Sequence, residues 1–175
     1  MKILCKLLLI FLLSTARVFA ADVFSSPSTA RDVMESLPEF KNIQCKFIQT
    51  KTMPNSQVVL KSGGDFVFNK DKGVIFYTKY PVVMTTSYDR NERINKIISA
   101  VINKNYNYLN KNFKFYYRIS ETDKGKIWEL GLIPVNSQIK SYIKSIYLSG
   151  NIKIKQIEIK SVDGVVTKIS FKGGK

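Results

Sequence analysis

Strict alternation of apolar and polar residues is the dominant pattern of this chain. Its clearest example is the stretch Gly63–Pro81, in which the run Asp65–Phe68 and the run Val74–Tyr77 flank the polar turn Asn69–Gly73. Two alternating runs around a polar, glycine-containing turn predict an antiparallel hairpin with one bulky aromatic face. A large apolar body must lie under that face.

The same period of two recurs along most of the chain, with turn residues between the runs. The glycine-containing pairs at 150–151 and 163–164 are typical of hairpin turns and join the last three runs into a meander. So many antiparallel strands in one small domain predict a strongly curved or partly closed sheet. The expected strands are Ile43–Thr52, Val58–Asn69, Gly73–Tyr80, Val82–Tyr88, Phe113–Ser120, Ile127–Ile133, Lys144–Ser149, Ile152–Val162 and Val165–Lys172.

Helical spacing is found in two places. Between residues 28 and 40, Thr29 precedes Asp32 by three positions and Val33, Met34 and Leu37 follow at helical spacing, which predicts one short amphipathic helix with a capped start. Between residues 90 and 109 the pattern is weaker, and we expect a short strand or turn followed by a helix over Ile97–Leu109. The many asparagines there favour turns, so a loop is the alternative.

The first twenty residues have the composition of a secretory leader. Lys2 and Lys6 supply positive charge, residues 7–13 are apolar, and Val18-Phe19-Ala20 places small residues at the sites that signal peptidase reads. We expect cleavage after Ala20, a single domain over residues 21–175, and a periplasmic product. The alternative is that the leader is not cleaved and anchors the protein in the membrane. We do not expect a covalent lipid anchor, because no cysteine directly follows the cleavage point.

Charge narrows the possible partners. The chain has 28 Lys and Arg against 13 Asp and Glu, a formal net charge of +15, and the leader carries only three of the positive charges. For an exported protein, an anionic membrane surface is a more available partner than nucleic acid, which we do not expect. The excess of lysine over arginine is equally consistent with a charge that serves solubility alone.

The chain offers little catalytic chemistry. It contains no histidine, which excludes Ser-His and Cys-His catalysis and histidine-bearing zinc sites. Glu121 and Asp123 lie in an expected turn, where solvated carboxylates are the simpler interpretation, and Cys45 is expected to be a small buried hydrophobe. We therefore expect neither an enzyme nor a cofactor or metal site.

Short motifs resemble those of the LolA family of periplasmic lipoprotein carriers. The Phe47-x-Gln49 pair is similar to the family's first strand, Pro81 follows Phe76 where the family has tryptophan and proline, and the stretches Gly64–Phe68, Leu130–Pro134 and Gly164–Phe171 are similar to later strands. The resemblance implies a mainly β, α+β fold: an incomplete, strongly curved antiparallel β-barrel closed by short helices over an apolar cavity.

The resemblance and the strand alternation together assign the cavity. We expect one set of strand residues to face it, and Lys70, which falls where the family carries a basic residue, to tether a lid and control release. The expected cavity residues are Phe47, Phe66, Phe68, Phe76, Trp128, Leu130, Ile146, Leu148, Ile157, Ile159, Ile169 and Phe171.

The function that the resemblance implies is a carrier that shields acyl chains. Its cargo would be a lipoprotein or another lipidated molecule. The carrier, expected to be a monomer, would receive the cargo from an inner-membrane donor complex and deliver it to an outer-membrane acceptor. A periplasmic sensor of the same fold, which binds lipidated ligands or a membrane protein, is the alternative. A secreted adhesin or structural β-domain stays open as a third class.

Overall fold

The computed structural model describes residues 22–69, 73–87, 93–123 and 125–173. The expected leader and Lys70 lie outside these residues. The helical elements are η1 (Val23–Ser25), α1 (Ala30–Ser36), α2 (Arg93–Ile102), α3 (Tyr106–Asn112) and α4 (Ser137–Lys140), and the strands are β1 (Pro27–Ser28), β2 (Ile43–Thr52), β3 (Val59–Asn69), β4 (Gly73–Tyr80), β5 (Met84–Ser87), β6 (Phe113–Thr122), β7 (Gly125–Pro134), β8 (Ile143–Gly150), β9 (Ile154–Ser161) and β10 (Val166–Lys172).

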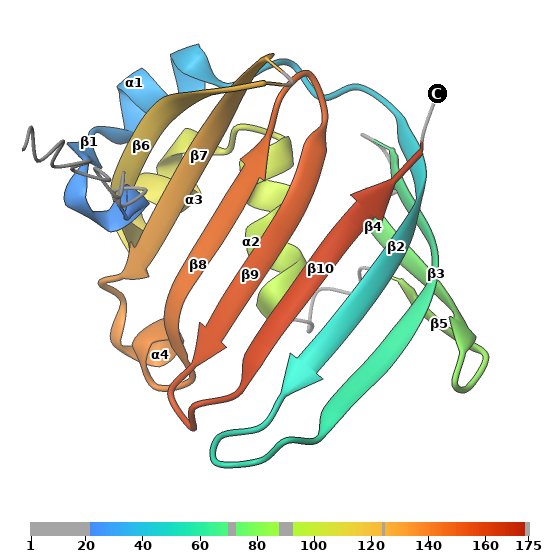
Figure 1. Ribbon diagram of the computed structural model, residues 1–175. Helices are drawn as coiled ribbons and strands as arrows, with labels where there is room; N and C mark the ends of the chain where they lie inside the picture. Colours follow the sequence, from blue (N-terminus) through green and yellow to red (C-terminus); the bar gives the residue numbers. More distant parts are fainter. Residues whose placement is uncertain (1–21, 70–72, 88–92, 124, 174–175) are drawn as a thin grey trace, which may run out of the picture.

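All the strands belong to one antiparallel sheet, in the order β1-β6-β7-β8-β9-β10-β2-β3-β4-β5. The sheet bends strongly, and α2 and α3 lie on its concave side (Figure 1). No pairing joins β5 to β1 in the described part of the chain, so the barrel is incomplete. The mainly β, open-barrel fold expected from the sequence is confirmed, and the bounds of β2 are those predicted.

The expected single helix over Ile97–Leu109 is wrong. The chain instead forms α2 and α3, with a break at residues 103–105 where Lys104 takes a positive φ of 51°. The side chain of Asn105 accepts a hydrogen bond from the backbone N–H of Tyr108 and so caps α3. An asparagine that can cap a new helix competes with continuing the old one, and α2 also begins earlier, at Arg93, where a strand or turn was expected.

The predicted cap of the first helix is confirmed, and the strand pair β3 and β4 contains a β-bulge at its two glycines. The Thr29 hydroxyl accepts a hydrogen bond from the backbone N–H of Asp32 at 3.1 Å, as a capping residue of α1 does. The register of β3 against β4 shifts between Gly63 and Gly64, which is a β-bulge. A Cβ atom at Gly64 would come within 1.9 Å of the Tyr77 carbonyl oxygen, so only glycine allows this close approach.

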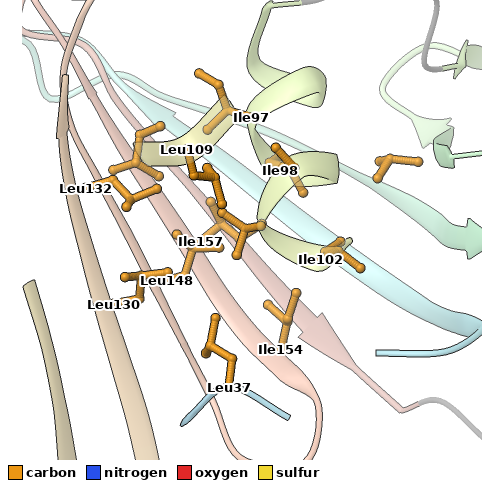
Figure 2. Packing of buried hydrophobic residues seen from close by; sticks show 14 of the residues in the cluster. Leu37, Ile97, Ile98, Ile102, Leu109, Leu130, Leu132, Leu148, Ile154 and Ile157 are labelled. Carbon is orange, nitrogen blue, oxygen red and sulfur yellow. The ribbon is translucent and has the colours of Figure 1, made fainter. Parts of the chain in front are cut away.

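The core fills the concave side of the sheet. Side chains of alternate strand residues meet apolar residues of α1, α2 and α3 there, in a single cluster. Figure 2 shows Ile97, Ile98 and Ile102 of α2 in the same buried cluster as Leu132 and Ile157 of the sheet. The buried side chains of α2 therefore cover part of the concave face of the sheet.

Candidate functional site

A cavity of about 410 Å³ lies at one end of the concave face. Its mouth lies at the end of the sheet where β2 and β4 end and β10 begins. The pairing of Val166 with Thr52 and of Tyr80 with Gly63 brings these strand ends to that side. The sheet supplies its floor and α2 supplies one wall. The lining residues are Phe47, Gln49, Lys51, Ser62, Phe76, Thr78, Pro81, Val82, Met84, Ile94, Asn95, Ile98, Ile159, Thr167 and Ile169.

Strand alternation gives this cavity an apolar floor and a polar rim. On β2, residues 47, 49 and 51 share the concave face, and they change from Phe through Gln to Lys toward the mouth. On β10 the corresponding change is from Ile169 to Thr167. An apolar chain can therefore lie on the floor while a polar or charged group stays at the rim.

The wall opposite the sheet comes from α2 and from the segment after β4. Ile94, Asn95 and Ile98 occupy successive positions on one side of α2, and all three line the cavity. The segment 81–84 completes the mouth with exposed apolar side chains. Since α2 is the only helix in this wall among the residues that the structure describes, its position decides how much of the concave face is covered at this end of the sheet.

The predicted cavity residues fall into two groups. Four of them line the cavity: Phe47, Phe76, Ile159 and Ile169. The others do not line it but belong to the same core, buried or, for Phe171, half-buried: Phe66, Phe68, Trp128, Leu130, Ile146, Leu148, Ile157 and Phe171. Their expected face is the one observed, and their contact with a ligand stays a prediction.

Aromatic contacts hold the floor in place. The ring centroids of Phe47 and Phe76 lie 5.0 Å apart in an edge-to-face arrangement, those of Phe66 and Phe76 lie 4.9 Å apart, and those of Phe66 and Phe171 lie 4.8 Å apart. Such pairs stabilise a core by about 0.5–1.5 kcal/mol each beyond the area that they bury. These rings, from β2, β3, β4 and β10, therefore form one packed aromatic cluster.

Trp128 lies away from the cavity. Its ring packs edge to face against Phe40 with centroids 6.0 Å apart, and its Nε1–H donates to the Asn151 carbonyl oxygen. The indole is 6% exposed and is not part of the cavity lining. In this arrangement the surroundings of Trp128 change only if the packing of the core changes.

The polar rim and the helical wall are not among the residues predicted from the sequence. The rim residues Gln49, Lys51 and Thr167 continue the alternating series that identified the floor, so extending each series by one or two positions finds them. The α2 residues Ile94 and Ile98 are spaced as on one helical face. That signal was present, but the start of the helix was placed too late to include Ile94.

A second hollow, of about 530 Å³, lies on another side of α2 and is polar. Arg93 lies over the ring of Tyr142 and Lys96 over the ring of Tyr108, each 5.0 Å from the ring centroid. Asn112 also lines it, together with residues of α4. The helix α2 therefore has one apolar side, which lines the first cavity, and one cationic side, which lines the second.

One charged network crosses β6, β7 and β8. Glu129 accepts hydrogen bonds from Arg118 Nε at 2.6 Å, from Ser120 Oγ at 2.5 Å and from Tyr147 Oη at 2.8 Å. Burial alone would raise the pKa of the Glu129 carboxyl, but these donors outweigh it and hold the pKa below its usual value. Burial raises the pKa of the Tyr147 hydroxyl to about 12.

The remaining candidate chemistry is sparse. Burial raises the pKa of the half-buried Cys45 thiol to about 11, which keeps it protonated, as expected for a packing residue. Within the described residues, no three His, Cys, Asp or Glu side chains gather as a metal ion would require. Among the helices that the structure describes, none is long and apolar enough to cross a membrane.

Comparison with solved structures finds 30 similar chains, among them the following three. A LolA superfamily protein from Nitrosomonas europaea is 11% identical, with 85% of this chain and 93% of that chain covered and a TM-score of 0.41. A DUF1329 family protein from Desulfovibrio piger is 9% identical, with 83% and 91% covered and a TM-score of 0.37. A putative outer membrane lipoprotein-sorting protein domain from Vibrio parahaemolyticus is 7% identical, with 88% and 93% covered and a TM-score of 0.32.

The first of these structures carries the name of the family that the short sequence motifs resemble. No family model and no curated protein sequence matches the chain.

Proposed function

We propose that this protein is a periplasmic carrier that shields an acyl chain of a lipoprotein or of another lipidated molecule and moves it between membranes. The observation that supports this most directly is the cavity on the concave face, with Phe47, Phe76, Ile159 and Ile169 on its floor and a polar rim at its mouth. A donor complex at the inner membrane and an acceptor at the outer membrane are part of the proposal.

The energetics of acyl transfer require such a cavity. Each methylene moved out of water is worth about 0.8 kcal/mol, so a chain of about sixteen carbons represents on the order of 12 kcal/mol. A protein that carries this chain through water must cover most of it. A ligand pocket of about 410 Å³ lies within the usual size range for small ligands.

The cavity is smaller than a long acyl chain needs. At roughly 30 Å³ per methylene, which is about the volume of one water molecule in the liquid, 410 Å³ holds roughly a dozen methylenes. Longer or additional chains require α2 to leave the concave face. Movement of α2 would uncover sheet residues that lie in the same buried cluster, such as Ile157 (Figure 2).

In this mechanism α2 acts as a lid that competes with the cargo. Ile97, Ile98 and Val101 are each at most 2% exposed, so docking of the helix buries apolar surface much as an acyl chain would. Because the acyl chain replaces the apolar side of α2 on the sheet, the net free energy of binding stays moderate. Release to an acceptor then requires only a small free-energy difference. Lys70, expected to tether the lid, keeps that role as a prediction.

The rim suits a polar head group. Lys51 is exposed and lines the mouth beside Gln49, so its ammonium can pair with an anionic group at the end of the acyl chain. The absence of histidine from the whole sequence supports a binding function over an enzymatic one. The leader-like first twenty residues support export.

A cavity-filling substitution tests the proposal. Thr78 lines the cavity, whereas its neighbour Tyr77 has the opposite strand parity and is 39% exposed. Thr78→Trp should weaken binding of palmitate, measured by isothermal titration calorimetry, by at least about tenfold, because displacing two methylenes at about 0.8 kcal/mol each is enough for that. Tyr77→Trp is the matched control and should bind as the wild type does.

Two results would contradict the proposal: no palmitate binding by the wild-type protein, or equal weakening by Thr78→Trp and Tyr77→Trp. Native mass spectrometry of the protein isolated from its own cell envelope supplies an independent check. A bound acylated molecule is the expected finding there.

A further inference from the structure

Exposed apolar side chains gather around the mouth of the cavity. Residues 82–84, which follow β4, are 70%, 82% and 57% exposed, and residues 58–60, around the start of β3, are 57%, 52% and 50% exposed. Val82 and Met84 line the mouth, and Leu60 pairs with Lys51, which also lines it. Single exposed apolar residues are ordinary, but consecutive ones at the entrance to an apolar cavity mark an interaction surface.

The charge of these two segments has one sign. Residues 51–62 and 78–87 contain Lys51, Lys61 and Lys79 and no aspartate or glutamate. Of these three lysines, Lys79 forms an ion pair with Asp65 of β3 at 2.7 Å, and Lys51 lines the mouth. Apolar side chains next to lysines are the composition of a surface that lies at the boundary between lipid head groups and acyl chains.

We propose that this mouth surface, residues 58–61 and 81–84, docks on an anionic phospholipid bilayer with the cavity entrance facing the lipid. The valines and Met84 would enter the head-group boundary, while the lysines contact lipid phosphates. An acyl chain could then pass between bilayer and cavity without crossing water. The inference rests on the proposed function only for this last step, since docking itself needs no cargo.

Vesicle binding tests the docking. The purified protein is mixed with vesicles of phosphatidylglycerol and phosphatidylcholine in equal parts, or of phosphatidylcholine alone, and bound protein is separated by sedimentation. We expect binding to the anionic vesicles and much weaker binding to the neutral ones. Val59→Asp combined with Val83→Asp should lower binding to the anionic vesicles by at least about tenfold, because a carboxylate is costly in the lipid interface and is repelled by its charge.

A matched control lies at the other end of the sheet. Ile152, in the turn between β8 and β9, is 76% exposed, and Ile152→Asp adds one carboxylate, half the charge that the double variant adds, away from the mouth. This variant should retain vesicle binding to within about twofold, since the charge effect falls off within a Debye length. Substitution of Val83 by Trp supplies a second readout, because the new indole should shift its emission to the blue only with anionic vesicles.

Each remaining outcome decides against the proposal. It is overturned if the wild-type protein does not bind anionic vesicles, or if the double variant and the Ile152 variant lose binding equally. It is also overturned if light scattering shows that the wild-type protein is a dimer and the double variant a monomer, since the mouth surface then binds a second copy of the chain. Neither Val59 nor Val83 lines the cavity, so palmitate binding without vesicles tests the carrier function separately.

Discussion

The competition between α2 and cargo can be measured by weakening the helix without touching the cavity. Ile97 is 1% exposed, lies on α2 and is not part of the cavity lining. Ile97→Val removes one buried methylene, which lowers the free energy of unfolding by about 1 kcal/mol. If docking of α2 excludes a long acyl chain, the same loss favours the open state that accepts the chain.

The expected gain in affinity follows from the size of that loss. A difference of about 1.4 kcal/mol is a factor of ten, so about 1 kcal/mol raises the open fraction, and lowers the apparent Kd for palmitate, by up to about fivefold. Titration calorimetry gives the Kd, and urea unfolding followed by the fluorescence of Trp128 gives the stability. The variant should thus bind more tightly while it unfolds more easily.

A buried residue of another helix separates this effect from general loosening of the core. Val33 is fully buried on α1, which packs against α3 and β6, and Val33→Ala should lower stability at least as much without raising affinity. The lid mechanism is refuted if Ile97→Val binds palmitate no more tightly than the wild type, or if Val33→Ala gains affinity equally.

Three further substitutions test the structure itself. Phe66→Ala removes a ring that is 2% exposed and contacts two other rings, and it should lower the free energy of unfolding in urea by about 4 kcal/mol; a loss near zero would contradict the aromatic floor. Because the pKa of Glu129 is lowered in the folded protein, its contribution is present above the pKa of an unfolded glutamate and is lost as the pH falls through the folded pKa. Glu129→Gln should therefore cost about 2 kcal/mol at neutral pH and little in acid, and a difference that does not change with pH would count against the network. Tyr117→Phe removes a buried hydroxyl that has no hydrogen-bond partner among the described residues, so thermal unfolding should show equal or higher stability, by up to about 1 kcal/mol; a clear loss would indicate a missed partner.

Local chemistry along the sequence determined most of the fold. Period-two alternation predicted the long strands because each residue's face is decided by its neighbours alone, and β2 runs from Ile43 to Thr52 as expected. The cap at Thr29 was predictable for the same reason, because it depends only on residues within one helical turn. Alternation also predicted which face of each strand is apolar, so Phe66, Leu130 and Ile157 are buried as expected.

Only the tertiary structure decided which of those buried residues border open space. Phe47 and Phe66 have the same pattern in the sequence, yet Phe47 lines the cavity and Phe66 does not. The difference depends on where α2 lies across the sheet, which follows from contacts between residues far apart in the chain. The partners of Glu129 were hidden for the same reason, since Arg118 and Tyr147 reach its carboxylate only when their strands pair.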